Sequence, residues 1–253
     1  MQQQLVNLSF LLFFQIILSG ILWFIGIQIN NIDFSIFNSS LNSFEISNIS
    51  SLIITILWIT GITNALNWID GLDGLASSIS FISSITLMIF CLSLGNYDMA
   101  IILTAISGCN LGFLPFNKYP AKLLMGDSGS YFLGFTFAIF SIMATNYSSL
   151  SKGSLSIFIP FFILFVPLID MFFVILMRLL NRKSPFIADR NHIHHRILKM
   201  GFSHNSTVKL IIYSDLFLCF TLISIMGLFN LQIYLGLSLI VLIFFIFRKK
   251  LEK

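Results

Sequence analysis

Long runs of apolar residues, separated by short polar segments, follow one another along almost the whole chain. A helix that crosses a bilayer needs about 20 mostly apolar residues, and about eight stretches approach or reach that length. We place them near Leu5–Ile29, Leu52–Leu66, Ser77–Leu94, Ala100–Phe116, Tyr131–Thr145, Leu155–Leu180, Thr207–Phe229 and Leu231–Phe247. Because lipid cannot satisfy backbone polar groups, we expect these stretches to be helices packed together in the membrane.

The composition excludes a water-soluble protein. Of the 253 residues, 57% are hydrophobic and only 9% are charged, which a soluble domain of this length could not carry without aggregating. No segment between the predicted spans is long enough for a separate soluble domain, so residues 1–253 are expected to form one all-α, polytopic transmembrane bundle. The short second stretch is expected to continue through Asn67–Asp70, whose polar groups must then face protein or water.

Lysine and arginine indicate which loops face the cytoplasm. Of the 14 Lys and Arg residues, all except Lys152 belong to one alternate set of loops and the chain end on the same side. Basic residues in short loops stay on the cytoplasmic side, so both termini and the segments Asn67–Ala76, Asn117–Gly129 and Asn181–Ser206 are expected there, at a plasma membrane. The acidic residues of these loops, which could converge on one site, are Asp70, Asp73, Asp127 and Asp189.

The segment between the second and third predicted spans carries polar residues spaced three apart: Asn64, Asn67, Asp70 and Asp73. This spacing places them along one side of a helix, and Gly71 and Gly74 let the chain turn where it meets water. One interpretation is a capped helix–turn–helix, in which an aspartate at a helix start offsets the helix dipole. The other is a ligand site, because these groups are costly to desolvate and yet lie at the membrane surface.

A second polar motif, Met125–Ser130, comes just before the fifth predicted span. Backbone N–H groups and small side chains at a helix start can bind an anion, and the Asp127 carboxylate is a hard oxygen ligand suited to magnesium. A glycine–serine turn with an N-capping residue is the alternative interpretation. Lys122 lies five residues before Asp127 and could pair with a phosphate or only extend to the membrane interface.

Three histidines within four residues, His192, His194 and His195, lie in the longest cytoplasmic loop, flanked by Arg190 and Arg196. Together they form a cluster of donors that can hold phosphate or sugar hydroxyls near neutral pH. A zinc site is the rival interpretation, but it is disfavoured because no cysteine or further histidine lies at the usual ligand spacing.

Two polar residues near this cluster receive a more ordinary interpretation. His204 is taken as a loop residue without a specific role. Asp170 lies within the sixth predicted span, where a carboxylate must face the bundle interior, and is expected to make a structural contact or support the site indirectly.

Taken in order, these motifs resemble those of one enzyme family. The motifs are Asn-x-x-Asn-x-x-Asp-Gly-x-Asp-Gly-Leu-Ala, then Gly-Asp-Ser-Gly-Ser, then Pro-x-x-Asp, Arg, Ser-Pro-Phe-x-x-Asp and His-x-His-His-Arg. They resemble the polyprenyl-phosphate N-acetylhexosamine-1-phosphate transferases of glycosyltransferase family 4. The His-Ile-His-His-Arg form is more similar to the undecaprenyl-phosphate N-acetylglucosamine-1-phosphate transferase branch than to the phospho-N-acetylmuramoyl-pentapeptide transferases.

The resemblance implies a reaction. A sugar 1-phosphate, an N-acetylhexosamine or a derivative, would pass from a UDP-sugar to polyprenyl (undecaprenyl) phosphate. The products would be a lipid-linked pyrophosphoryl sugar and UMP, in the first membrane step of a cell-surface polysaccharide such as an O-antigen. No nucleic-acid partner is implied, and a homodimer is compatible with this reading.

The resemblance also implies residue roles. Mg²⁺, or Mn²⁺ in its place, would be bound by Asp127 together with Asp70. Asp70 and Asp73, the other catalytic carboxylates, would complete the metal shell or position the lipid phosphate for attack. The residues implied to bind the donor are Asn64, Asn67, Lys122, His192, His194, His195 and Arg196.

The family pattern further implies more N-terminal spans and an adjacent aspartate pair in an inner loop before the first stretch. This chain begins with Met1-Gln2-Gln3-Gln4 where that loop would end, so we expect those spans and the pair to be missing. On this interpretation the chain alone would be inactive or severely impaired.

Two other functions fit parts of the sequence. An inactive fragment or partner subunit of such an enzyme would explain the missing pair, but gives no physical reason to retain the other polar motifs. A small-molecule transporter could use Asp170 and Arg178 along a substrate path, but should have inverted repeats with interrupted helices in matching halves, which we do not find.

Overall fold

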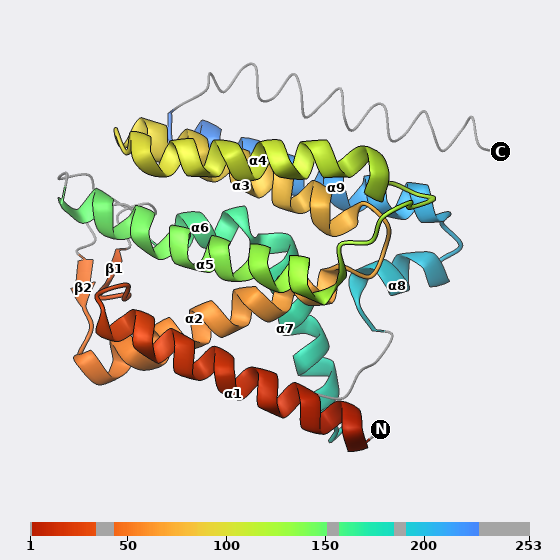
Figure 1. Cartoon of the computed structure of the whole chain (residues 1–253), viewed down its shortest axis with the longest axis horizontal. Coiled ribbons are helices and arrows are strands. Elements are labelled where there is room, and N and C mark those ends of the chain that lie inside the picture. The colour runs from red at the N-terminus through yellow and green to blue at the C-terminus, as the bar shows by residue number, and fades with distance from the viewer. Residues whose placement is uncertain (1, 34–42, 151–156, 185–190, 228–253) are drawn as a thin grey trace.

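The computed structural model describes residues 2–33, 43–150, 157–184 and 191–227 (Figure 1). The elements in chain order are α1 (Gln2–Phe24), β1 (Asn31–Asp33), β2 (Ser43–Glu45), α2 (Asn48–Ile69), α3 (Leu75–Ser93), α4 (Tyr97–Asn117), α5 (Gly126–Leu150), α6 (Phe158–Ile163), α7 (Phe165–Leu180), α8 (Ile193–Lys199) and α9 (His204–Ile225). Helices therefore dominate the described residues, and the prediction of an all-α membrane bundle is confirmed.

Five of the described helices are long and apolar enough to cross a membrane: α2, α3, α4, α5 and α9. The number of about eight spans is not confirmed. The first predicted span forms α1, whose apolar section Phe10–Phe24 is shorter, and the last, Leu231–Phe247, lies outside the described residues.

The sixth predicted span, Leu155–Leu180, is not one continuous helix, which corrects the expectation from the sequence. The chain breaks at Leu164, which caps both α6 and α7 with φ −103° and ψ 21°. Pro167 explains the break, because it has no N–H to donate to the Ile163 carbonyl and its ring clashes with that carbonyl in a regular helix. In Figure 1, α7 turns away from the direction of α6.

Capping residues fix the starts of three of the long helices. The side chains of Ser47, Asn96 and Ser203 each accept a hydrogen bond from the backbone N–H three residues further along, at the starts of α2, α4 and α9. A side-chain oxygen at this position satisfies a backbone donor that the helix itself leaves unpaired.

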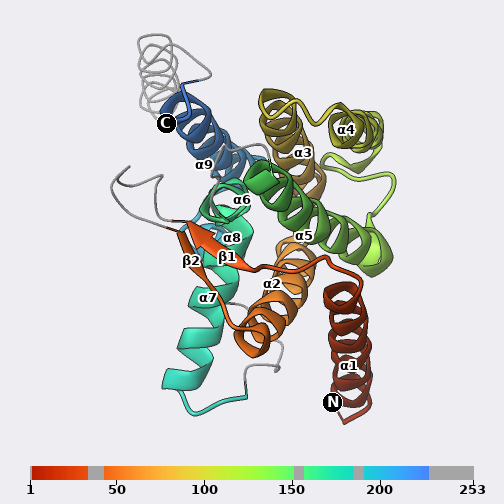
Figure 2. The ribbon, with the colours of Figure 1, turned by 90° about the vertical axis from the view of Figure 1, so that its left-hand side faces the viewer.

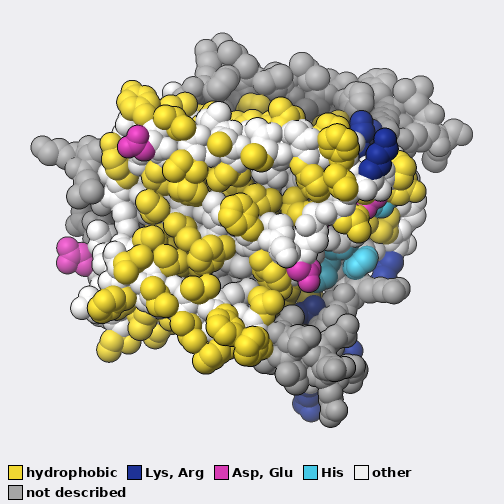
Figure 3. All heavy atoms as spheres, in the orientation of Figure 1, with side chains coloured by type: hydrophobic (Ala, Val, Ile, Leu, Met, Phe, Trp, Pro, Cys, Tyr) yellow, Lys and Arg dark blue, Asp and Glu magenta, His cyan; other side chains and the backbone are white. Residues whose placement is uncertain are grey.

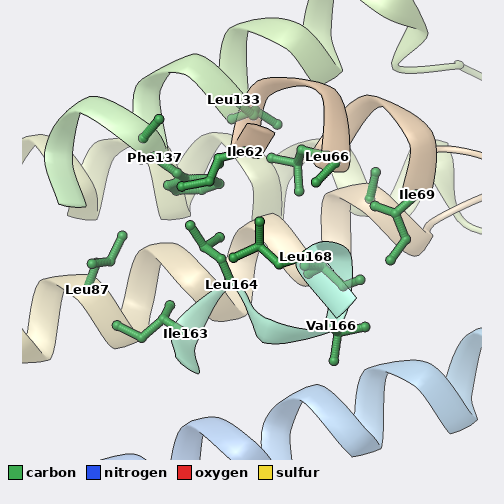
Figure 4. Packing of buried hydrophobic residues seen from close by; sticks show 14 of the residues in the cluster. Ile62, Leu66, Ile69, Leu87, Leu133, Phe137, Ile163, Leu164, Val166 and Leu168 are labelled. Carbon is green, nitrogen blue, oxygen red and sulfur yellow. The ribbon is translucent and has the colours of Figure 1, made fainter. Parts of the chain in front are cut away.

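The apolar core lies among α2, α3, α5 and the α6–α7 break (Figure 4). Ile62 and Leu66 of α2 face Phe137 of α5, and Leu164 lies below them at the break. The backbones of α2 and α5 approach so closely at Gly134 that an added Cβ would lie 2.7 Å from the Thr63 Cα. Small residues allow such close contacts between helices in a membrane, where no hydrophobic effect drives helices together.

The helices run back and forth, so their connections gather at two ends of the bundle. At one end, nearest the viewer in Figure 2, β1 and β2 form an antiparallel hairpin in which Asn31 pairs with Glu45. At the other end lie the α2–α3 turn, the α4–α5 loop and α8 (Figure 1).

Candidate active site

The three polar motifs meet at the end of the bundle where α8 lies. The first motif closes α2 and opens α3, the second opens α5, and the third forms α8. Figure 3 shows the coloured Lys, Arg and His side chains on this side of the molecule. Helices of alternating direction thus bring together segments that are far apart in the sequence.

A hydrogen-bonded amide joins the first motif to the second. The Asn67 Nδ2 atom, in the last turn of α2, donates to Asp127 Oδ1 at 3.1 Å and to Ser130 Oγ at 2.9 Å. Ser130 is buried, and its hydroxyl also lies 3.2 Å from the Gly126 carbonyl oxygen. Asn67 therefore holds the first turn of α5, and with it Asp127, against the end of α2.

Three carboxylates lie close enough to repel one another. Asp70, the C-cap of α2, has a pKa raised from 3.8 to about 6, mainly by burial and further by the charges of Asp127 and Asp73. An acid with a raised pKa between two other acids lacks a compensating positive charge. Such a cluster is suited to a bound cation.

The donor set fits magnesium better than a metal held by protein alone. Among the described residues, no group of three or more His, Cys, Asp or Glu side chains is arranged to hold an ion. Mg²⁺ commonly takes one or two carboxylates and completes its shell with water and substrate phosphates. Asp70 and Asp127 can supply those two carboxylates, and the Asn67 amide keeps Asp127 in place.

A residue that the sequence analysis did not single out, Asn117, ties the α4–α5 loop to the first motif. Its Oδ1 accepts hydrogen bonds from the Gly74 N–H at 3.2 Å and the Ser77 hydroxyl at 2.8 Å, while its Nδ2 donates to the Leu123 carbonyl at 2.9 Å. In the sequence, Asn117 is a polar residue at the end of an apolar span, and the structure shows that it is buried. The pairings could not be foreseen, because they link residues about 40 positions apart.

Asp73 makes a similar link. Its Oδ2 accepts a hydrogen bond from the Ala121 N–H at 3.0 Å. The contact orders the α4–α5 loop beside the carboxylate cluster.

The third motif packs directly on the first through His194. This ring is buried, at 1% exposure, and lies so close to Gly71 that a Cβ atom on Gly71 would overlap it. Burial, followed by the neighbouring His195 and His192, lowers the pKa of His194 from 6.5 to about 4. His194 is therefore neutral near pH 7 and offers one donor and one acceptor nitrogen.

His192 is held at the start of α8 by residues of α7 and α2. Its Nδ1 lies 2.8 Å from Asp170 Oδ2, and its ring meets the Trp68 ring edge to face at 5.6 Å. The buried Arg178 guanidinium lies 5.0 Å from the centroid of the same Trp68 ring. Asp170 thus makes the structural contact expected from the sequence.

Asn64 lies one helical turn before Asn67 and faces a different neighbour. Its Nδ2 donates to Gln15 Oε1 of α1 and to the Thr60 carbonyl, both at 2.7 Å. The structure therefore places Asn64 between α2 and α1, apart from the Asn67–Asp127 pair.

The remaining predicted donor-binding residues lie nearer the surface. Lys122 is exposed on the α4–α5 loop. His195 is half-buried against the His194 ring, with ring centroids 4.3 Å apart. Arg196 is exposed, and its guanidinium lies 4.3 Å from the centroid of the Phe173 ring of α7.

His204 is more than the ordinary loop residue predicted from the sequence. At the start of α9 its ring stacks on Tyr119 of the α4–α5 loop, with centroids 4.3 Å apart. Two flanking residues of the third motif, Asp189 and Arg190, lie outside the described residues.

Fold and site together define a multi-pass, predominantly helical membrane protein with a carboxylate- and histidine-rich polar site at one end of its bundle. Within that class the sequence comparison is specific. Residues 6–145 match the sequence model of glycosyl transferase family 4, and the chain belongs to this family. The family resemblance drawn from the motifs is confirmed.

Several curated relatives are similar over part of the chain. A probable undecaprenyl-phosphate N-acetylglucosaminyl 1-phosphate transferase of Bacillus subtilis (strain 168) is 42% identical over 128 residues, 51% of this chain and 35% of the relative. A decaprenyl-phosphate N-acetylglucosaminephosphotransferase of Mycobacterium leprae is 38% identical over 123 residues, 46% of this chain and 31% of the relative. An undecaprenyl-phosphate alpha-N-acetylglucosaminyl 1-phosphate transferase of Pasteurella multocida is 32% identical over 160 residues, 62% of this chain and 43% of the relative. The chain thus spans less than half the length of these relatives.

Proposed function

We propose that the protein transfers N-acetylhexosamine 1-phosphate from a UDP-sugar to polyprenyl phosphate. The names of the relatives support a polyprenyl-phosphate acceptor and an N-acetylglucosamine 1-phosphate group. The observation that carries the proposal is the joining of Asp70, Asp127 and His194 at one end of the bundle, through the Asn67 hydrogen bond and the packing on Gly71.

The reaction is a displacement at phosphorus. A phosphate oxygen of the lipid attacks the β-phosphorus of the UDP-sugar, the bond from that phosphorus to the oxygen bridging to the α-phosphate breaks, and UMP leaves. The product is a lipid-linked pyrophosphoryl sugar. Such reactions require mostly positioning and charge neutralisation from the protein.

Asp70 and Asp127 would hold Mg²⁺, or Mn²⁺ in its place, and the ion supplies charge neutralisation on the pyrophosphate. Asn67 keeps the Asp127 carboxylate oriented, and Asp73 keeps the α4–α5 loop beside it. His192, His194, His195 and Arg196, with Lys122 and Asn64, would hold the sugar and phosphates of the donor.

An apolar groove supports the lipid acceptor. It lies between α4 and α5, has a volume of about 440 Å³ and is lined by side chains that include Ile106, Phe113 and Leu133. Its lining includes Met125 and Gly129, which lie on either side of Asp127 in the chain. An isoprenoid chain in this groove would place its phosphate beside the carboxylate cluster.

We also propose that the site faces the cytoplasm at a plasma membrane, where nucleotide sugars are available. The support is electrostatic, because the basic side chains gather at the site end of the bundle (Figure 3) and such residues stay inside. This step would open the synthesis of a cell-surface polysaccharide.

A direct assay tests the proposal. Membranes containing this chain, alone or together with the preceding segment of the Bacillus subtilis relative, are supplied with labelled UDP-N-acetylglucosamine, undecaprenyl phosphate and Mg²⁺. We expect magnesium-dependent formation of labelled lipid and of UMP in equal amounts in the preparation that contains the preceding segment, and little or none from the chain alone. Failure of both preparations to form labelled lipid, with the chain correctly inserted, would reject the proposed function.

A further inference from the structure

The carboxylate of Asp170 is buried inside α7, with 4% of the residue exposed, and both of its oxygens are used at the start of α8. Oδ2 lies 2.8 Å from His192 Nδ1, and Oδ1 accepts a hydrogen bond from the Ile193 N–H at 2.6 Å. A buried carboxylate is costly unless such bonds compensate it. Asp170 is therefore specifically matched to the first two residues of the histidine motif.

We infer that Asp170 is a positioning residue, which fixes the His192 ring with its proton on Nδ1 and so presents Nε2 as a hydrogen-bond acceptor to the bound sugar donor. An ionised carboxylate can only accept hydrogen bonds, so the ring nitrogen facing it carries the proton. The identity of the ligand in this inference rests on the proposed function, whereas the protonation of the His192 ring follows from the Asp170 contact alone.

Helix capping alone does not explain this arrangement. A cap requires one oxygen on a backbone N–H, and Asp170 Oδ1 already fills that role at Ile193. The second oxygen constrains a side chain instead. Neighbouring rings add to the constraint, because Trp68 meets His192 edge to face and His194 lies parallel to it, 5.7 Å away with an angle of 7° between the planes.

The chemistry of Nε2 defines the group that it would recognise. In the neutral ring with its proton on Nδ1, Nε2 has a free lone pair and accepts from a hydroxyl or amide N–H, whereas a ring protonated on both nitrogens would not. A sugar with hydroxyls and an N-acetyl group offers both kinds of donor, whereas an unprotonated phosphate oxygen offers neither. His192 would accordingly contact the sugar, and the phosphates would fall to other residues.

The tautomer can be measured without any activity. The whole chain, labelled with ¹⁵N only at histidine, is studied by NMR in detergent, and His192→Gln identifies the His192 signals. We expect the wild-type ring to carry its proton on Nδ1. A proton on Nε2 in the wild-type protein would overturn the inference whether or not the chain transfers a sugar.

Asp170→Asn is the decisive variant. The Asn carbonyl can still accept from the Ile193 N–H, while its NH₂ group faces Nδ1 and donates, which moves the His192 proton to Nε2. Asp215→Asn is the matched control, because Asp215 is another buried carboxylate in a neighbouring helix and has no hydrogen-bond partner among the described residues. We expect the proton to move in Asp170→Asn and to stay in the control, and an unmoved proton in a folded Asp170→Asn would contradict the pairing.

Kinetics separate positioning from simple stabilisation. In the reversed tautomer the His192 Nε2–H faces the hydroxyl or amide N–H of the sugar, and two donors cannot form a hydrogen bond. The KM for UDP-N-acetylglucosamine should therefore rise about tenfold or more in Asp170→Asn. A loss of folded protein alone would lower kcat and leave KM unchanged. In a His192→Ala background, Asp170→Asn should have no further effect on KM, and a full second effect there would count against action through His192.

The two proposals fail in different ways. If the wild-type chain neither binds nor uses UDP-N-acetylglucosamine while NMR finds the Nδ1 proton and its reversal, the proposed function fails and the pairing stands. If the donor is used but Asp170→Asn changes neither the tautomer nor KM, the pairing fails and the proposed function stands.

Discussion

At the residue scale, Gly71 has the most restricted position in the site. The His194 ring lies against the Gly71 Cα, where a Cβ atom would overlap it, so a methyl group there must displace the buried ring. We expect Gly71→Ala to lower the free energy of unfolding by about 1–3 kcal/mol and to weaken donor binding. Gly112, where an added Cβ would have no described residue within 4 Å, is the matched control, and Gly112→Ala should be neutral or slightly stabilising in thermal unfolding.

The raised pKa of Asp70 predicts how the stability of the metal-free protein changes with pH. Its pKa rises from 3.8 to about 6 in the folded protein, so the folded state binds its proton more tightly than the unfolded chain does. Without metal, stability should therefore fall as pH rises through this range, and the loss is complete above about pH 6.

Asp70→Asn removes this effect. Near pH 7 the metal-free variant should be more stable than wild type by on the order of 1 kcal/mol, a value discounted for partial exposure, and below the unfolded pKa the two should match. Thermal unfolding in detergent with a chelator measures this difference. A variant that is less stable than wild type near pH 7 would show that Asp70 is not under repulsion.

The sequence revealed many of these residues but not their pairings. Polar groups at a membrane surface are conspicuous, which is why Asn67, Asp70 and Asp127 could be selected from spacing and cost of desolvation. The reason for glycine at position 71 could not be predicted, because His194 comes more than a hundred residues later. Residue type shows which groups need a partner, and only the fold shows which partner they have.

At the element scale, the contact between α2 and α5 determines the geometry of the carboxylates. α2 carries Asn67 and Asp70, and α5 carries Asp127, so the separation of these helices sets the distance between the acidic groups. Gly134 lies against the α2 backbone, which cannot move aside as a flexible side chain can.

Gly134→Ala should therefore force the two helices apart. We expect a loss of about 1–3 kcal/mol in the free energy of unfolding, together with weaker magnesium-dependent donor binding as the Asn67–Asp127 hydrogen bond lengthens. Gly112→Ala again provides the control, since it adds the same methyl group to a helix at a position without a contact to any other part of the chain that the structure describes. An equal melting temperature for both variants would contradict the close contact between Gly134 and the α2 backbone.

The helices themselves were largely predictable, and the exceptions have physical causes. Apolar length located α2 to α5 and α9 because the bilayer imposes it. The break at Leu164 was missed because the segment is apolar throughout, and hydropathy carries no information on the clash of Pro167 with the preceding turn. α8 was missed because seven residues rich in histidine and arginine have no apolar run to reveal them.

At the scale of the whole molecule, the distribution of basic residues predicts the side of the membrane on which each end of the bundle lies. In a cysteine-free background, Tyr97→Cys at the start of α4 and Met200→Cys after α8 place exposed thiols at opposite ends. An impermeant maleimide applied to intact cells should label Tyr97→Cys, and Met200→Cys only after permeabilisation. The reverse pattern would place the site outside, where no nucleotide sugar is available.

The charge pattern of the sequence was sufficient for that prediction, whereas the assembly of the site was not. Alternating spans require inner loops to share a side, but they do not require those loops to touch. The contacts of Asn67 and His194 supply the missing step, because each joins two motifs that lie far apart in the sequence, and Asn117 ties the α4–α5 loop to the first motif.

Calorimetric titration of UDP-N-acetylglucosamine into the purified chain shows whether the three motifs form one magnesium-dependent site for a nucleotide sugar. We expect saturable binding that requires Mg²⁺, is lost in Asp127→Asn and is unchanged in Asp98→Asn, since Asp98 is an exposed carboxylate at the opposite end of α4. Binding of equal affinity in wild type and Asp127→Asn, with or without Mg²⁺, would contradict such a site.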